Sequence, residues 1–138
     1  MMEIPKRIIV VDDDSINNMY CRYIIKEALE NVASNEESEI VMFAIPQKAL
    51  NYINSEYLAN PVPTLIFLDI NMPVLSGWDV LEELERSEVV IKDFFKIYIL
   101  SSSVDPVDKE RADNSPLVSG FLEKPLDVNI VRSICGIV

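Results

Sequence analysis

Histidine is absent from the 138 residues of this chain, and its absence removes several classes of chemistry. Ser-His-Asp and Cys-His hydrolases need an imidazole as their general base, and many zinc sites need one as a ligand. Without histidine the chain also cannot itself carry a phosphohistidine. Its chemistry must therefore rest on other side chains.

Basic residues are scarce as well. The chain has 12 lysines and arginines against 23 aspartates and glutamates, so its formal net charge is −11. Such a chain lacks the positive patch that binds phosphate backbones or anionic lipids. No apolar run is long enough for a membrane-spanning helix, and the N-terminus shows no export signal. We therefore expect a soluble, cytoplasmic protein that binds neither nucleic acid nor membrane directly.

Only two cysteines occur, Cys21 and Cys135, and neither lies in a metal-binding or disulfide motif. In a reducing compartment such isolated thiols most simply behave as small buried apolar groups. The chain is 49% hydrophobic and has the length of one domain. We expect one hydrophobic core and a single domain over residues 1–138.

Hydrophobic patterning alternates along the chain between strand and helix. Runs rich in β-branched residues predict strands at 7–11, 40–44, 64–69, 96–100 and 118–123. Helical spacing predicts a helix after the first strand, and further helices at 46–58, around 80–84, at 106–112 and from 127 onward. Five alternations predict an α/β fold: a doubly wound five-stranded parallel sheet with helices on both faces. The strand order we expect is the flavodoxin-like 2-1-3-4-5.

The first predicted helix has apolar residues at the spacing of one helix face. We expect this face to pack against the core, with Asp14 or Ser15 as the N-cap. Trp78 and the tyrosines are also interpreted as packing residues. The residues of the apolar face are Ile16, Met19, Tyr20, Tyr23 and Ile24.

Polar side chains stand at the carboxyl ends of four predicted strands. Asp12 and Asp13 follow the first strand, and Asp69 is the last residue of the third. Ser101 follows the fourth strand and Lys124 follows the fifth. Ligands of open α/β sheets bind at this edge, so we expect these side chains to form one site.

The aspartates of this edge predict a bound cation. In the expected order the first and third strands are neighbours about 4.8 Å apart, which brings Asp13 close to Asp69. Two like charges about 4 Å apart repel by roughly 4 kcal/mol at an effective dielectric of about 20. Either one carboxyl group is protonated or a cation binds. Mg²⁺ suits Asp12, Asp13 and Asp69 together with a backbone carbonyl from the following loop, and its open positions would suit a phosphate oxygen.

Asp69 is also a candidate nucleophile toward phosphorus, because carboxylates form covalent phosphoryl intermediates. Phosphoryl transfer needs in-line positioning and positive charge on the equatorial oxygens. Lys124 and the metal would supply that charge, and Ser101 could donate a hydrogen bond to the transferred group. These three residues are therefore the predicted catalytic residues.

Four segments give the chain a resemblance to a known family. The segments are IIVVDDD, LIFLDINMPVLSGWDVL, IYILSSS and GFLEKPL, which together span about residues 7 to 126. In this order, each at the carboxyl end of a strand, they resemble the receiver domain of two-component response regulators. The resemblance is to the single-domain, chemotaxis-regulator-like kind.

The resemblance implies that Asp69 accepts a phosphoryl group from the phosphohistidine of a separate histidine kinase or phosphotransfer protein. Asp13 would hold Mg²⁺ directly and Asp12 partly through water. Asn71 would offer its backbone carbonyl to the metal. The domain would not be an enzyme acting on other molecules, since it would only accept a phosphoryl group and later hydrolyse its own acyl phosphate.

The resemblance also implies a switch. Ser101 and Lys124 match the hydroxyl residue and the lysine of the family, and Pro125 matches a proline whose peptide bond is commonly cis. Phe121 matches an aromatic residue that turns inward when Ser101 moves onto the phosphate. The changed surface would signal to a downstream protein, whose identity the sequence does not indicate.

Two departures from the family pattern stand out. Asp69 follows Asp13 by 56 positions (69 − 13), a longer separation than in a compact receiver, and we expect the excess in loops at 31–39 and 54–63. The last helix is short, which puts in doubt a dimer face built on it. Nothing follows that helix in the sequence, so we expect no output domain.

Two other functions are compatible with parts of the sequence. VVDDDS contains the D-x-D of haloacid-dehalogenase-type phosphohydrolases, but that reading leaves Asp69 unused and offers only Asp127 where a further acidic pair is needed. A receiver-like interaction module that is never phosphorylated is the second alternative. All of the residues that carry out the chemistry of a receiver are present, which argues against this second alternative.

Overall fold

A computed structural model of the chain describes residues 4–30, 38–86, 94–102 and 105–137, except for the side chains of residues 56–58. Five strands form one parallel sheet: β1 (Arg7–Val11), β2 (Glu39–Phe43), β3 (Thr64–Leu68), β4 (Phe95–Ser101) and β5 (Val118–Glu123). The helices are α1 (Ser15–Leu29), α2 (Pro46–Ala59), α3 (Gly77–Arg86), α5 (Pro106–Asp113) and α6 (Val128–Ile134). The strand order is β2-β1-β3-β4-β5, which confirms the predicted order.

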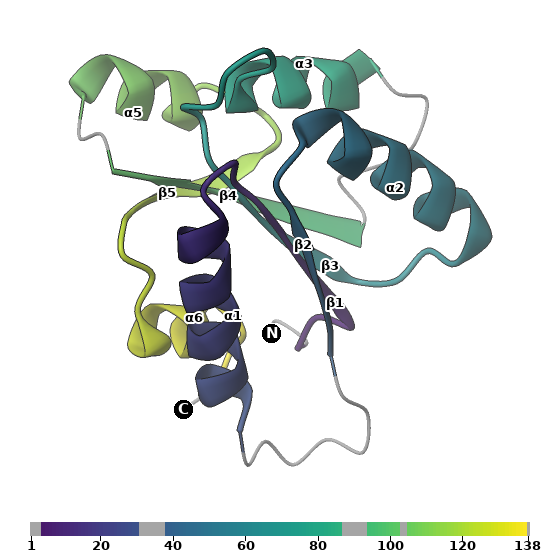
Figure 1. Ribbon diagram of the computed structural model, residues 1–138, viewed down its shortest axis with the longest axis vertical. Helices are drawn as coiled ribbons and strands as arrows, with labels where there is room; N and C mark the ends of the chain where they lie inside the picture. The colour runs from purple at the N-terminus through teal and green to yellow at the C-terminus, as the bar shows by residue number, and fades with distance from the viewer. Residues whose placement is uncertain (1–3, 31–37, 87–93, 103–104, 138) are drawn as a thin grey trace.

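Helices cover both faces of the sheet, as predicted (Figure 1). Successive residues of β1, such as Ile8 and Ile9, belong to different clusters of buried apolar side chains. The cluster around Ile9 includes residues of α2, α3 and α5, and the cluster around Ile8 includes residues of α1 and α6. Because successive side chains of a strand point to opposite faces, a strand buried on both faces is mostly apolar, and β1 and β3 are apolar at every position after Arg7 and Thr64. All five residues of β1 and of β3 are buried.

The predicted inner face of α1 was wrong. Ile24 is buried, but the other four residues of the predicted face are exposed: Ile16, Met19, Tyr20 and Tyr23. The face that packs inward contains Asn18, Cys21, Ile25 and Ala28. Cys21 and Ala28 are small, so the helix can lie close to the sheet, and the asparagines of its first turns bond to the end of β1.

The element boundaries differ little from those predicted, except at one loop. The helix predicted at 46–58 is α2, so residues 54–59, which were also assigned to a long loop, form the last turns of this helix instead. Most of the other predicted loop, residues 31–37, lies outside the described part of the chain. Asp127 is the N-cap of α6, and the helix begins at the next residue.

Other packing predictions are confirmed. Cys21 and Cys135 are buried free thiols, and burial raises the pKa of each to about 11. Trp78 is partly buried and packs against the core, as predicted. The packing predicted for Tyr20 and Tyr23 is wrong, because both side chains are exposed. No helix among the described residues has both the length and the apolar character needed to cross a bilayer.

Candidate phosphoryl-acceptor and metal site

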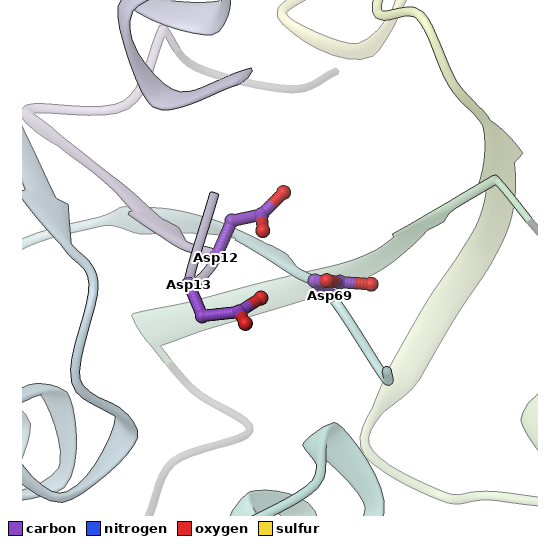
Figure 2. Close-up of side chains that lie close together, drawn as sticks. All are labelled: Asp12, Asp13 and Asp69. Carbon is purple, nitrogen blue, oxygen red and sulfur yellow. The ribbon is translucent and has the colours of Figure 1, made fainter. Parts of the chain in front are cut away.

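Three carboxylates meet at the carboxyl edge of the sheet. Asp12 and Asp13 follow β1, and Asp69 follows β3, which pairs with β1 in parallel register. One oxygen from each of the three carboxylates lies within 4.8 Å of the other two (Figure 2). Asp12 and Asp69 are 2% and 5% exposed, and Asp13 is exposed. The predicted convergence of these acids is confirmed.

The loop after β1 is held by its own carboxylates. The backbone N–H of Asp14 donates to Oδ1 of Asp12 at 2.9 Å. Asp14 itself accepts from the backbone N–H groups of Ile16 and Asn17, at 3.0 and 3.2 Å, and is the N-cap of α1. An N-cap carboxylate satisfies backbone donors that the first helical turn leaves free. The predicted cap role of Asp14 is therefore confirmed.

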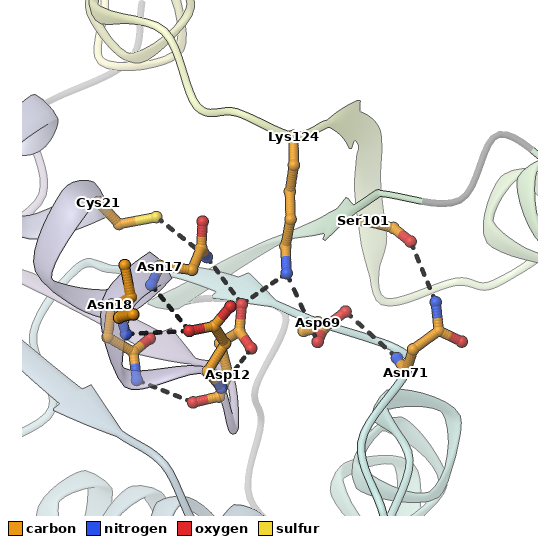
Figure 3. Close-up of polar contacts among 10 residues, drawn as sticks. Asp12, Asn17, Asn18, Cys21, Asp69, Asn71, Ser101 and Lys124 are labelled. Atoms are coloured by element: carbon orange, nitrogen blue, oxygen red, sulfur yellow. Dashed lines mark hydrogen bonds and ion pairs between the residues drawn. The ribbon is translucent and has the colours of Figure 1, made fainter.

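Two asparagines of α1, which sequence reasoning missed, also hold Asp12. Nδ2 of Asn17 donates to Oδ2 of Asp12 at 2.7 Å, and Nδ2 of Asn18 donates to its backbone carbonyl at 2.8 Å (Figure 3). A buried carboxylate is costly unless hydrogen-bonded, so these contacts stabilise its position. The available signal was a pair of adjacent amides in the first turn after the capping residue Asp14, in a helix otherwise expected to bury apolar groups.

Lys124 brings positive charge to the cluster from the end of β5. Its Nζ lies 2.6 Å from Oδ2 of Asp12 and 3.6 Å from Oδ2 of Asp69 (Figure 3). Burial by itself would lower the pKa of Lys124, but the bonds and charges of the two aspartates outweigh it and raise that pKa. The peptide bond between Lys124 and Pro125 is cis, in agreement with the prediction. A backbone bond from Lys124 N–H to the carbonyl of Ser101, 2.8 Å long, fixes the start of this loop.

Asp69 lies in an environment that disfavours its charge. Burial, together with the nearby charge of Asp12, raises the pKa of Asp69 to about 6, although a backbone hydrogen bond from Asn71 and the charge of Lys124 act in the opposite direction. That backbone N–H donates to Oδ1 of Asp69 at 3.2 Å. Burial and the charge of Asp12 thus outweigh the backbone hydrogen bond and the single ammonium that favour the charged form of Asp69.

The other predicted residues lie around this cluster. Ser101 is fully buried at the end of β4, and its Oγ lies 3.5 Å from Nδ2 of Asn71. Asn71 is itself exposed. Phe121 is half-buried in β5 and packs against the cluster of apolar side chains beneath α2, α3 and α5. Ser101 and Asn71 therefore lie beside Asp69, and Phe121 lies on the strand next to Ser101.

Gly77 is a third residue that sequence reasoning missed. A Cβ atom at this position would lie 2.4 Å from the backbone oxygen of Asp69 and 2.8 Å from Cα of Ile70. The backbone N–H of Gly77 donates to the carbonyl of Ile70 at 3.2 Å. Only a residue without a side chain lets α3 begin so close to the backbone of Asp69 and Ile70. The sequence signal that could have indicated this close contact was the glycine that ends the segment NMPVLSG.

The donor atoms of this cluster fit Mg²⁺. Three carboxylates share one ammonium, so the fully ionised cluster carries two net negative charges that a divalent cation would balance. All of the candidate ligand atoms are oxygen, which hard cations prefer. The same geometry would let an anionic phosphoryl group approach once the charge is balanced.

Comparisons with known proteins agree on one family. The family model described as the response regulator receiver domain matches residues 8–134. A curated relative, the probable transcriptional regulator ycf27 of Cyanophora paradoxa, is 30% identical over 94% of this chain. The match covers 48% of that relative, so the chain spans about half its length.

Solved structures give the same result. A two-component response regulator from Cytophaga hutchinsonii is 29% identical, with a TM-score of 0.82 and coverage of 94% of this chain and 93% of the other. The phosphorylated cyanobacterial phytochrome response regulator RcpA is 26% identical, with a TM-score of 0.68 and coverage of 94% and 88%. With its strand order, its three converging aspartates and a family match over nearly its whole length, this chain belongs to the response regulator receiver domain family, the phosphoacceptor domains of two-component signalling.

Proposed function

We propose that Asp69 is the residue of this receiver that accepts a phosphoryl group from the phosphohistidine of a second protein. The observation that supports this choice is the position of Asp69. One of its carboxylate oxygens lies within 4.8 Å of an oxygen of Asp12 and of Asp13, and its Oδ2 lies 3.6 Å from Nζ of Lys124. A carboxylate oxygen would attack phosphorus while the bond between phosphorus and the imidazole nitrogen breaks. The products are an acyl phosphate on Asp69 and a free histidine on the donor.

Asp12, Asp13 and Asp69 are the residues that would hold Mg²⁺, with the backbone carbonyl of Asn71 as a further ligand. When bound, the ion supplies positive charge to the oxygens of the transferred group. Asp13 is exposed, whereas both oxygens of Asp12 already accept hydrogen bonds from the chain. This difference supports a direct contact for Asp13 and a partly water-mediated one for Asp12.

Lys124 and Ser101 would respond to the new phosphoryl group. Lys124 is close enough to Asp69 to pair with an oxygen added there, and an ammonium binds phosphate as a point charge. Ser101 has its hydroxyl beside the amide of Asn71, and turning toward the phosphate would exchange that weak contact for a charge-assisted bond. Phe121 would follow by turning into the space that Ser101 leaves, which changes the surface around β4 and β5.

The protein would therefore act as a signalling domain. Its only further reaction would be hydrolysis of its own acyl phosphate, in which water attacks phosphorus and Asp69 leaves as a carboxylate. The donor would be a histidine kinase or phosphotransfer protein in the cytoplasm, and the target would be a protein that recognises the switched surface. Residues 8–134 would form this unit.

Intact-mass measurement tests the assignment of Asp69. In the presence of Mg²⁺ and acetyl phosphate, the wild-type chain should gain the mass of one phosphoryl group. Asp69→Asn should abolish the gain, whereas Asp113→Asn, at an exposed position of α5, should leave it intact. A wild-type chain that gains no mass would point to the unphosphorylated interaction module. Turnover of phosphomonoesters that depends on Asp12 would point to a phosphohydrolase.

A further inference from the structure

One oxygen of the Asp12 carboxylate is shared by two side-chain donors. Asp12 is 2% exposed, and its Oδ2 accepts from Nδ2 of Asn17 at 2.7 Å and from Nζ of Lys124 at 2.6 Å (Figure 3). Its other oxygen, Oδ1, accepts from the backbone N–H of Asp14 at 2.9 Å. Among the described residues, Oδ2 therefore depends on one neutral donor and one charged donor.

The charged donor would have to change partner when Asp69 is phosphorylated. Nζ of Lys124 lies 2.6 Å from Asp12 but 3.6 Å from Asp69, so in this state the lysine is bonded to Asp12 rather than to the acceptor. A phosphoryl group on Asp69 would add charged oxygens that attract the ammonium. Once Lys124 turns toward them, Oδ2 of Asp12 loses a donor at a nearly buried position, where a carboxylate oxygen without a partner is costly.

Asn17 is held so that its amide stays on Asp12. Its backbone N–H donates to the N-cap residue Asp14 at 3.2 Å, which fixes it in the first turn of α1. Its Nδ2 also lies 3.6 Å from Sγ of Cys21, one helical turn further on. An amide nitrogen has two hydrogens, and here each has an acceptor. None of these contacts involves Lys124, so the amide can keep its bond to Asp12 when the lysine leaves.

A neutral donor suits position 17 better than a charged one. A lysine or arginine there would be attracted to the phosphoryl group and would compete with Lys124 for it. It would also offset more of the negative charge of the carboxylate cluster and so weaken the attraction for Mg²⁺. The amide of Asn17 has no net charge, so it can bond to Asp12 before and after phosphorylation without either effect.

We infer that Asn17 is a positioning residue of the phosphorylation switch, because it keeps Oδ2 of Asp12 hydrogen-bonded while Lys124 moves to the phosphoryl group on Asp69. The inference rests on the proposed function. Loss of the amide should have little effect while Lys124 is still bonded to Asp12, and a larger one after Lys124 has moved. Asn18 differs from Asn17 in this respect, because it donates to the backbone carbonyl of Asp12 and not to the carboxylate.

The test compares the two states of the site with a stable mimic. Beryllium trifluoride binds an aspartate carboxylate in place of a phosphoryl group and is not hydrolysed. Calorimetry measures the affinity for Mg²⁺ without the mimic, and fluorine NMR measures the affinity for the mimic with Mg²⁺ in excess. Intact mass follows the rate of phosphorylation by acetyl phosphate.

Three variants are compared with the wild-type chain. Asn17→Leu keeps the size of the side chain but has no donor. Asn17→Gln keeps an amide donor on a longer stem and is the conservative variant. Asn51→Leu, at an exposed position of α2, is the control for the same substitution elsewhere.

The expected loss is selective for the switched state. Asn17→Leu should bind Mg²⁺ nearly as well as the wild-type chain, because Lys124 still bonds to Asp12 before phosphorylation. Its affinity for beryllium trifluoride and its rate of phosphorylation should each fall by about tenfold or more, as expected when a hydrogen bond to a charged group is lost. Asn17→Gln should recover part of the loss, and Asn51→Leu should match the wild-type chain in all three measurements.

A double-mutant cycle tests whether Asn17 and Lys124 substitute for each other on Asp12. In Lys124→Met the ammonium is absent, so the amide of Asn17 is the remaining side-chain donor to Oδ2 among the described residues. In urea unfolding with EDTA, Asn17→Leu should therefore destabilise the Lys124→Met chain more than it destabilises the wild-type chain. Equal losses in the two backgrounds would overturn the inference.

Two further outcomes would overturn the inference while leaving the proposed function intact. One is a loss by the same factor for Mg²⁺ and for beryllium trifluoride in Asn17→Leu, which would mean that Asn17 only supports the fold of the site. The other is a variant that binds both ligands and is phosphorylated as the wild-type chain is. A wild-type chain that neither binds beryllium trifluoride nor gains a phosphoryl group would overturn the proposed function itself, and the inference with it.

Discussion

The carboxylate of Asp12 is among the most strongly bonded groups of the site. It accepts from the backbone N–H of Asp14, the amide of Asn17 and the ammonium of Lys124. A buried carboxylate is tolerated when its lone pairs are filled in this way. Lys124 also interacts with Asp69, because its Nζ lies 3.6 Å from Oδ2 of that residue. One ammonium thus interacts with two nearly buried acids, and it neutralises the charge of only one of them.

Lys124→Met should destabilise the metal-free chain. The substitution keeps an apolar stem but leaves Asp12 and Asp69 without their shared cation, and loss of one partner of a buried pair costs about 3–5 kcal/mol. Because Lys124 is partly exposed, we expect a loss of about 2–3 kcal/mol in the free energy of unfolding at neutral pH. Urea denaturation in EDTA measures it. Lys109→Met, at an exposed position, is the control, and an equal loss there would contradict the argument.

Gly77→Ala should disturb the acceptor loop. The added Cβ would overlap the backbone oxygen of Asp69, and backbone atoms cannot move aside as the end of a side chain can. We expect a loss of about 1–3 kcal/mol in the free energy of unfolding and slower phosphorylation by acetyl phosphate. Gly120→Ala is the matched comparison, because its Cβ would meet the ring of Tyr98 instead. If both variants kept wild-type phosphorylation rates, close packing at Gly77 would be irrelevant to the acceptor.

At the scale of elements, α3 and α5 are joined by one arginine. The guanidinium carbon of Arg111, on α5, lies 4.5 Å from the ring centroid of Trp78, on α3, and a nitrogen of Arg111 lies 3.8 Å from a carboxylate oxygen of Glu82. Helix α3 follows the strand that ends at Asp69, and α5 follows the strand that ends at Ser101. The contact therefore connects the segment that follows Asp69, the proposed acceptor, to the segment that follows Ser101, the proposed switch residue.

Arg111→Ala should change the surroundings of Trp78 with little effect on the fold. A cation–π contact at an exposed site contributes about 0.5–1 kcal/mol, so the loss of stability should not exceed about 1 kcal/mol. Trp78 is the single tryptophan of the chain, and its emission should shift to longer wavelength as its ring gains contact with water. Fluorescence spectra of the two proteins provide the measurement. Arg22→Ala on α1 should leave the spectrum unchanged, and identical spectra for all three proteins would refute the contact.

Helix α1 shows the limit of reading a periodic pattern. Apolar residues at helical spacing correctly predicted a helix after β1, but they did not show which face packs inward. The orientation depends on the small side chains Cys21 and Ala28, which let the helix approach the sheet, and on Asn17 and Asn18, which bond to the end of β1. These contacts join residues of different elements, so single-helix periodicity does not contain them.

For the molecule as a whole, the clustered acids make the stability of the fold depend on pH. The chain carries −11, and three of its acids meet within one site. Asp69 has its pKa raised by burial to about 6, from an ordinary value of 3.8. A carboxyl group with a raised pKa in the folded state stabilises the fold below its unfolded pKa, and this stabilisation is lost as the pH rises through the folded value. The metal-free fold should therefore lose stability between about pH 4 and pH 7, by about 3 kcal/mol for a shift of about two units.

Mg²⁺ should restore stability in a pH-dependent way. It binds the ionised carboxylates, and it stabilises the folded chain by mass action because only the folded chain brings them together. Millimolar Mg²⁺ should raise the melting temperature clearly at about pH 7.5 and only slightly at about pH 5, where Asp69 is largely protonated. Thermal melts with Mg²⁺ or EDTA at the two pH values measure the effect. Asp69→Asn should show less dependence on both pH and Mg²⁺, and a melting temperature indifferent to Mg²⁺ at every pH would contradict the metal site.

The sequence by itself determined the parallel sheet, its strand order and the acids and lysine at its edge. The sheet and its edge depend on local patterns, since β1 and β3 are apolar after their first residue and the acids and the lysine come directly after the ends of strands. The strand order is the flavodoxin-like order expected of such a sheet. Only the tertiary structure decided that Asn17 and Asn18 hold Asp12, that Gly77 lies under Asp69, and that α1 turns an apolar stripe outward. Each of these results from how closely one element packs against another, and that distance depends on side chains far apart in the chain.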